Sequence, residues 1–252
     1  MEFLGIGWQD WLFAALGAAL IGLSKGGLPG AGNVSIWIFA EVFGAKESVG
    51  YLLPVLVCGD TVAIIIYRRN ADWGHVWRLF PPMAIGVLAG WLLFHQIPAQ
   101  EFRVVMGCLL LMMTALHFGR KWMLRKQQAG EDKVPHAKWF IWSTGVGGGL
   151  ATMLANAAGP VAAFYLMAVR LPKFAFIGTS AWLFFMINLF KMPFQAQLGT
   201  VNVTSIPISL TLGVVAALAC LVAPRIVKYI PQRQFEWLVW AVIVFAGVRL
   251  IF

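Results

Sequence analysis

The sequence contains few charged residues, and acidic residues are especially scarce. Only 12% of its 252 residues are charged, 10 of them Asp or Glu, whereas 60% are hydrophobic and the mean hydropathy is +0.80. A soluble domain of this length needs far more polar surface to remain in solution. The composition therefore excludes a soluble globular protein and predicts a membrane protein.

The chain also lacks the spacings that metal sites and disulfide frameworks need. Its three cysteines, Cys58, Cys108 and Cys220, stand singly within apolar stretches, and no CxxC or CxxH pattern occurs. The four histidines show no metal-ligand spacing either. We expect free buried thiols, no metal site and no cofactor.

The formal net charge of +9 would suggest nucleic-acid binding in a soluble protein. Here the basic residues fall in short loops between apolar segments, which is how membrane proteins set their orientation. The lipid bilayer, and not nucleic acid, is therefore the predicted partner of this surface.

Ten apolar segments are predicted to be helices. A full crossing needs about 20 apolar residues, and the third, fourth, fifth, eighth, ninth and tenth segments meet or approach that length. The first, second, sixth and seventh are short. The segments run over residues 8–23, 33–43, 49–67, 79–95, 102–119, 138–154, 159–169, 174–192, 204–223 and 235–251.

The short segments form two pairs, and a glycine-rich break interrupts each pair. The breaks read GLSKGGLPGAG over residues 22–32 and GLATMLANAAGP over residues 149–160. Short helices joined by Gly and Pro at membrane depth predict re-entrant hairpins or broken helices. Such backbone is tolerated where it is buried in protein or lines a cavity.

The two halves align with each other at a shift of 127 residues. Gly22 then matches Gly149, and later Gly86 matches Gly213, in order along two series of five segments. This order predicts an internal repeat.

The basic loops predict that the two repeats have opposite orientation. If these loops lie in the cytoplasm, both termini are outside, the first half begins outside and the second begins inside. The predicted fold is an all-α polytopic membrane protein of two inverted-topology repeats, each a broken or re-entrant helix pair plus three full transmembrane helices. Within this single membrane domain the repeats span residues 1–120 and 138–252, and a cytoplasmic linker spans residues 121–137. The basic loops are 68–78, 120–138, 170–173 and 225–233.

Both breaks are candidate substrate sites, because exposed amides at a helix start attract anions and glycine lets a ligand approach the backbone. Lys25 adds a positive charge in the first break, although it could also snorkel to the interface. The glycines could instead serve helix packing. The candidate substrate-binding residues are Ser24, Lys25, Gly26, Gly27, Gly30, Thr152, Asn156, Gly159, Pro160, Asn188 and Lys191.

Three of the polar residues lie inside the long apolar segments. Lys191 is either an interfacial anchor or a substrate ligand, and Asn188, one turn earlier on the same face, favours a polar pathway. Asp60 is an acid at depth, where an isolated carboxylate is protonated or paired. It is therefore a candidate proton carrier or a partner for a lysine, with a structural hydrogen bond as the alternative.

At these residues the chain resembles the sulfite exporter TauE/SafE family of membrane transporters, over nearly its whole length. The resemblance rests on GLSKGGLPGAG in the first half and on ANAAGP, LPKF, GTSAWLFFMIN and KMPF in the second. The chain departs from the pattern at Asn33, Ser35 and Trp37, where many members carry apolar residues and a proline.

The resemblance implies export of small sulfur-containing anions, such as sulfite or organosulfonates, across the bacterial inner membrane. Proton coupling would rest on Asp60. A scaffold or assembly subunit is the alternative, although it would not need a charged residue in a glycine break. An intramembrane enzyme is not expected, since the membrane segments carry no nucleophile–base pair or clustered metal ligands.

Overall fold

Ten α-helices account for nearly all of the residues that the computed structural model describes. Those residues are 2–3, 6–28, 30–127, 138–169, 171–227, 229 and 232–252. A short hairpin of β1 (Glu2–Phe3) and β2 (Ile6–Gly7) precedes the helices. The helices are α1 (Trp8–Lys25), α2 (Ala31–Phe43), α3 (Ala45–Tyr67), α4 (Trp73–Gln96), α5 (Ala99–Gln127), α6 (Lys138–Ala155), α7 (Gly159–Ala168), α8 (Lys173–Gln197), α9 (Ser205–Val227) and α10 (Gln232–Ile251), with a 3-10 turn, η1 (Arg68–Asn70), after α3.

Each predicted apolar segment coincides with one of these helices for most of its length. Among the described residues, five helices are long and apolar enough to cross a membrane, namely α3, α4, α5, α8 and α9. The chain is therefore a multi-pass membrane protein. The tenth segment, predicted as a full crossing, appears as the shorter apolar helix Trp237–Ile251 within the part of α10 whose side chains are described.

The predicted linker is partly helical. Helix α5 continues to Gln127, so the first residues of the 121–137 segment extend a helix that was expected to end near residue 119. Residues 128–137, and the basic residues Arg170 and Lys228 of two other predicted loops, lie outside the described residues.

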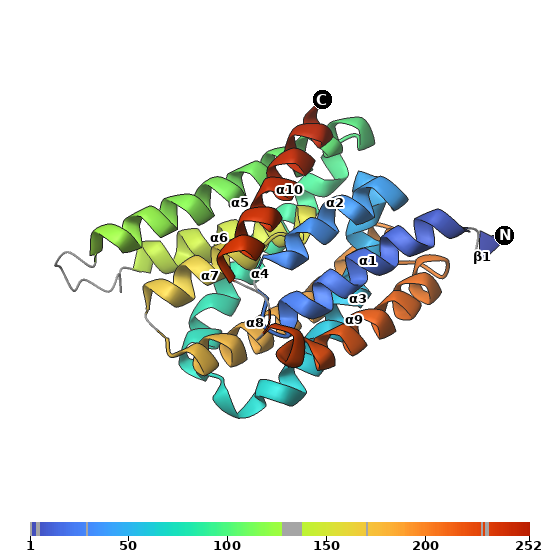
Figure 1. Ribbon diagram of the computed structural model, residues 1–252. Coiled ribbons are helices and arrows are strands. Elements are labelled where there is room, and N and C mark those ends of the chain that lie inside the picture. Colours follow the sequence, from blue (N-terminus) through green and yellow to red (C-terminus); the bar gives the residue numbers. More distant parts are fainter. Residues whose placement is uncertain are drawn as a thin grey trace.

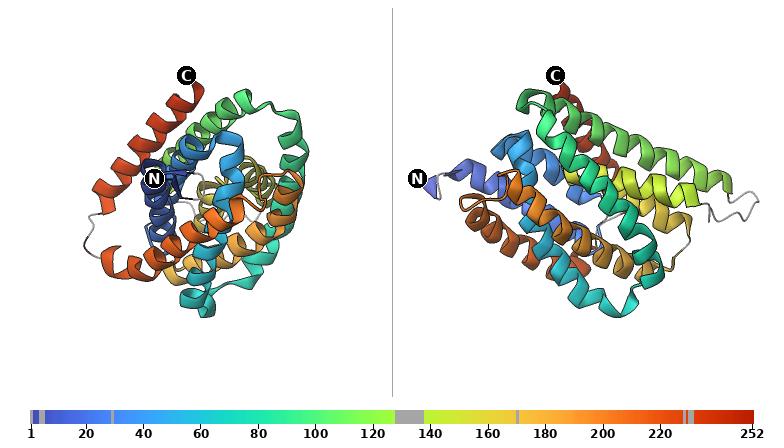
Figure 2. Two further views of the ribbon diagram at one scale, coloured as in Figure 1. Left: turned by 90° about the vertical axis from the view of Figure 1, so that its right-hand side faces the viewer. Right: turned by 180° about the vertical axis from the view of Figure 1, so that it is seen from behind.

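The helices lie side by side around the two short broken pairs, with both chain termini on the side away from the C-terminal end of α5 (Figure 1). Helix α4 packs along α6, and α9 packs along α1. Near the middle of the bundle α3 packs against α8, and α10 packs against α5 (Figure 2).

Small residues permit the close packing of α1 with α9 and of α4 with α6. A methyl group at Gly22 would overlap the carbonyl oxygen of Ala216, and one at Gly149 would overlap the carbonyl oxygen of Met83. Backbones that approach this closely need glycine, as is common between membrane helices. Small residues therefore allow the first helix of each broken pair, α1 or α6, to lie against its neighbour at backbone contact distance.

Replacing Gly149 with alanine should destabilise the protein by about 1–3 kcal/mol or more, because the new methyl group must push α6 away from α4. Gly147 is the matched control on the same helix, since a methyl group there meets nothing within 4 Å. Gly147→Ala should be neutral or slightly stabilising. Thermal unfolding in detergent measures both, and equal melting temperatures would contradict this packing.

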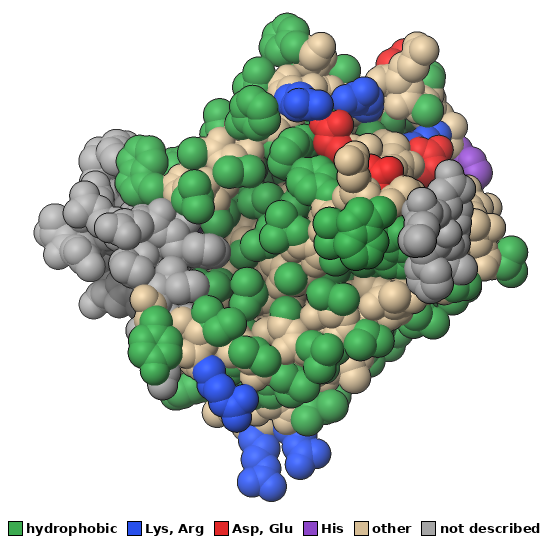
Figure 3. All heavy atoms as spheres, turned by 45° about the vertical axis from the view of Figure 1, so that its right-hand side comes forward, with side chains coloured by type: hydrophobic (Ala, Val, Ile, Leu, Met, Phe, Trp, Pro, Cys, Tyr) green, Lys and Arg blue, Asp and Glu red, His purple; other side chains and the backbone are tan. Residues whose placement is uncertain are grey.

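Charged side chains gather at the two ends of the bundle, with an apolar belt between them (Figure 3). One end, here called the basic end, carries the exposed residues Arg68, Arg69, Arg78 and Arg225. The opposite end carries Glu47 and Glu101 together with Lys46, Arg103 and an ion pair between Glu41 and Arg249 at 3.0 Å. Such a belt is expected of a surface in contact with lipid.

Candidate functional site

The first break is built by two glycines with positive φ. Helix α1 ends at Lys25, and Gly27 (φ 132°) turns the chain so that the N–H of Leu28 donates to the carbonyl of Leu23 at 3.0 Å. Gly30 (φ 97°) then starts α2. Both conformations favour glycine, which explains why the sequence breaks its helix here.

The second break uses asparagine and proline for the same purpose. Helix α6 ends at Ala155, and Asn156 adopts the left-handed conformation (φ 54°) that asparagine tolerates better than most residues. Helix α7 begins at Gly159 with Pro160 in its first turn, where proline fits because no intrahelical N–H is needed.

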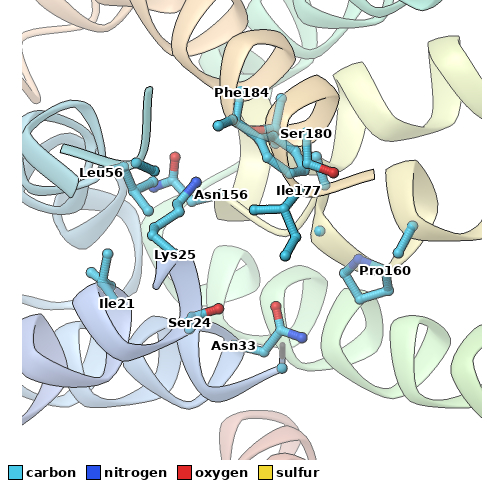
Figure 4. A pocket seen from close by; sticks show the side chains of 18 of the residues that line it. Ile21, Ser24, Lys25, Asn33, Leu56, Asn156, Pro160, Ile177, Ser180 and Phe184 are labelled. Atoms are coloured by element: carbon cyan, nitrogen blue, oxygen red, sulfur yellow. The ribbon is translucent and has the colours of Figure 1, made fainter. Parts of the chain in front are cut away.

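The two breaks face a common cavity of about 590 Å³, within the usual range for small-molecule sites. Ser24 and Lys25 enter it from the end of α1, while Ile177, Ser180 and Phe184 of α8 lie across from them (Figure 4). The predicted site residues that line it are Ser24, Lys25, Gly27, Gly30, Thr152, Asn156, Gly159, Pro160 and Asn188.

Three predicted residues lie outside this lining. A methyl group on Gly26 would meet Ala223 and Cys220 of α9, so this glycine serves packing. Asp60 and Lys191 are fully buried behind the cavity wall.

Lys25 connects the cavity to buried Asp60. Its Nζ lies 2.5 Å from Asp60 Oδ1 and 4.6 Å from the ring centre of Phe184, and 16% of its side chain stays exposed. Asn188, from α8, donates from Nδ2 to Asp60 Oδ2 at 2.8 Å. One acid of α3 thus joins the end of α1 to the middle of α8.

Lys191 holds the second break. Its Nζ donates to the carbonyl oxygen of Thr152 at 2.7 Å, to Thr152 Oγ1 at 3.1 Å and to Asn156 Oδ1 at 2.6 Å. These three acceptors match the three donors of an ammonium group. Lys191 therefore sits at the C-terminal end of α6 much as Lys25 sits at that of α1, where a cation is favoured by the helix dipole.

Away from the basic end, hydrogen bonds tie the second break and the end of α6 to α3 and α8. Asn156 Nδ2 donates to the carbonyl of Val49 at 3.0 Å, and Gln195 Nε2 donates to the carbonyl of Met153 at 3.2 Å. Thr200 Oγ1 donates in turn to Gln195 Oε1 at 2.5 Å.

Toward the basic end the cavity continues along the first turns of α8. Phe176 and Ile177 line it there, and the neighbouring Thr179 accepts a hydrogen bond from the N–H of Asp72, just after η1, at 2.9 Å. Since η1 carries Arg68 and Arg69, this part of the lining lies on the side of the basic end.

The comparison with protein families decides what kind of protein has this architecture. The family model described as sulfite exporter TauE/SafE matches residues 14–250, nearly the whole chain. The chain belongs to the TauE/SafE family. No curated protein and no solved structure matches it. Membership in a family of transporters accounts for a cavity inside a membrane protein that is lined by a lysine and several other polar side chains.

In this TauE/SafE protein the three residues that were expected to depart from the family pattern have different structural roles. Asn33 lines the cavity. Ser35 donates to the carbonyl of Gly17 at 2.7 Å, which ties α2 to α1, and Trp37 Nε1 donates to Glu41 at 3.0 Å. Only the first of the three is therefore placed to affect a substrate.

Sequence reasoning missed several residues of the TauE/SafE cavity. His117 of α5 and Trp240 of α10 line it and stack on each other with ring centres 4.1 Å apart. No sequence pattern distinguishes such aromatic residues from those that face lipid. Gln195 is buried outside the lining and was also missed. It did give a signal, because it follows Lys191 by four residues and so lies on the same helix face.

Proposed function

We propose that the protein is a secondary transporter that exports small sulfur-containing anions, such as sulfite or organosulfonates, across the bacterial inner membrane. The observation that carries this proposal is Lys25, a partly exposed lysine at a helix break that lines a cavity. Lys191 and Asp60 lie behind the wall, so two lysines and one acid are formally present at the site. The first turns of α2 and α7, whose N-termini favour anions, add to this preference.

We further propose that the two halves are inverted-topology repeats, each with a broken pair and three full crossings. The packing supports this, because exchanging the halves turns the α4–α6 pair into α9–α1, and the α2–α10 pair into α7–α5. The same exchange turns Gly149, which faces the carbonyl oxygen of Met83 on α4, into Gly22, which faces the carbonyl oxygen of Ala216 on α9. Inverted repeats of this kind place substrate near the midplane.

One difference between the halves supports alternating access. Helix α2 packs against α3 far more extensively than α7 packs against α8, and the cavity lies between α7 and α8. Exchanging the conformations of the halves would close α7 onto α8 and open a gap between α2 and α3 at the other end. The structure then corresponds to the state open toward the basic end, which the positive-inside rule assigns to the cytoplasm.

Cysteine labelling tests which side the cavity opens to. In a variant without the native cysteines, Ser180→Cys should react with a membrane-impermeant maleimide from the cytoplasmic side, and sulfite should slow the reaction several-fold. Leu189→Cys is the control, since Leu189 lies on the outer surface of the same helix with 44% exposure and should not react in the membrane. Labelling of residue 180 only from outside would contradict the proposed state.

The proposed function is tested by transport of labelled sulfite into liposomes that contain the purified protein. Saturable uptake above that of protein-free liposomes is expected, with competition by unlabelled sulfite and by an organosulfonate. Sulfate and thiosulfate, added as further competitors, show how selective the uptake is for sulfite. Folded protein that moves none of these anions would refute the substrate class, and a non-transporting scaffold role would then explain the architecture better.

A further inference from the structure

The carboxylate of Asp60 occupies the place on Lys25 that an anionic substrate would need. The ammonium of Lys25 is in contact with Asp60 Oδ1 on one side and with the face of Phe184 on another, and only part of the side chain reaches the cavity. An anion entering the cavity therefore meets a lysine that already has an internal counter-ion. Binding and release of substrate must involve competition for this one cation.

The surroundings of Asp60 decide what happens when it loses that contact. Its partners are Lys25 of α1 and Asn188 of α8, while Lys191 of α8 and Cys220 of α9 are the other titratable groups that act on it electrostatically. Lys191 already donates three hydrogen bonds to the second break, so it is not free to replace Lys25. A carboxylate left unpaired at this depth is costly, whereas a protonated carboxyl group is not.

Asn188 can serve Asp60 in both protonation states. Its amide group donates from Nδ2 to the carboxylate in the structure. After rotation of the amide, the carbonyl oxygen of Asn188 can accept a hydrogen bond from a protonated Asp60. The position of Asn188 thus suits an acid that gains and loses a proton during function.

We propose that each monovalent anion which binds Lys25 displaces Asp60, and that Asp60 takes up one proton from the solvent by way of the cavity as it does so. The inference rests on the proposed function. The ion pair between Lys25 and Asp60 breaks, an O–H bond forms on Asp60, and a new ion pair forms between Lys25 and the anion. The empty site holds Lys25⁺ and Asp60⁻, and the loaded site holds Lys25⁺, the anion and neutral Asp60.

Two consequences follow from this charge balance. Transport of a monovalent anion is electroneutral, since the net charge of the site is the same with and without substrate. Bisulfite and monovalent sulfonates are the preferred substrates, because Lys25 is the lysine that lines the cavity among the described residues and it neutralises one charge. Proton and anion move in the same direction, so accumulated substrate inside the cell must drive export.

The test uses labelled methanesulfonate, whose single charge does not change with pH, in liposomes that contain a pH-sensitive dye. Wild-type protein should acidify the lumen by about one proton per anion taken up, and an imposed potassium diffusion potential should not change the initial rate. Asp60→Asn should lower the proton-to-anion ratio at least tenfold and make net uptake sensitive to potential. Exchange of labelled for unlabelled anion should persist in this variant.

The control variant is Glu41→Gln, which removes a carboxylate at the bundle periphery that pairs with Arg249 and should keep the wild-type ratio. If Asp60→Asn does not fold, the proton-to-anion ratio of the wild type and the effect of membrane potential on its uptake still test the inference. Asp60→Glu, which keeps a titratable carboxylate, should keep the coupling. Anion uptake without proton movement, or coupling that survives in Asp60→Asn, would overturn the inference and leave the proposed function standing.

The two remaining outcomes separate the substrate assignment from the function. Sulfite uptake with no transport of methanesulfonate and no competition by it would overturn the preference for monovalent sulfonates alone. If neither sulfite nor methanesulfonate moves, the proposed function itself fails.

Discussion

Replacing Lys25 with alanine should lower sulfite uptake by roughly 30- to 4000-fold. Truncating one member of a desolvated charge pair costs about 2–5 kcal/mol, and each 1.4 kcal/mol corresponds to a factor of ten. The substrate would lose the ammonium group that lines the cavity. Initial uptake rates in liposomes, normalised to folded protein, measure the effect.

The single variant has a second consequence that must be separated from the first. Without Lys25, Asp60 remains buried with Asn188 as its partner, and removing one member of a buried ion pair costs about 3–5 kcal/mol of stability. The double variant Lys25→Ala/Asp60→Asn removes both charges. It should recover most of the lost melting temperature and remain inactive. Restored uptake in the double variant would mean that Lys25 only neutralises Asp60 and does not bind substrate.

The helices and their breaks could be predicted because local sequence determines them. A run of apolar residues has one stable conformation in lipid, since every backbone polar group must be satisfied within the segment. Gly27, Gly30 and Asn156 likewise show where the chain must leave the helix, because each adopts a positive φ in the structure. Both kinds of signal lie within a few residues of the feature they predict.

The pairing of polar residues across the bundle could not be predicted in the same way. The sequence indicated that Asp60 needs a partner, but Lys25 lies on α1 and Asn188 lies 128 residues away on α8. Which of them reaches Asp60 depends on how α1, α3 and α8 pack. Hydropathy carries no information on that, because residues facing lipid and residues facing other helices are equally apolar.

The roles of the two lysines illustrate this difference. Both lysines lie inside the bundle next to the end of a broken helix, and the sequence made both of them candidate ligands. In the structure Lys25 reaches the cavity, whereas Lys191 is fully buried and bonded to Thr152 and Asn156. One lysine is placed to meet substrate, and the other holds the break that shapes the site.

Replacing Lys191 with alanine should therefore reduce stability rather than affinity alone. The change removes three charge-assisted hydrogen bonds, leaves the Thr152 carbonyl and Asn156 Oδ1 without that donor, and opens a cavity behind the break. Each unsatisfied buried acceptor costs about 1–3 kcal/mol, so a total loss of about 3–5 kcal/mol is expected. The melting temperature in detergent and the yield of monodisperse protein measure it.

Lys191→Met separates the loss of hydrogen bonds from the loss of volume. Methionine fills most of the space of the lysine stem but donates no hydrogen bond. The melting temperature of Lys191→Met should therefore lie between those of Lys191→Ala and the wild type. Any uptake that remains in Lys191→Met should keep the wild-type KM for sulfite, because no substrate contact has been removed. A normal melting temperature with a strongly raised KM would instead show that Lys191 binds the anion directly, in a conformation in which it has left Thr152 and Asn156.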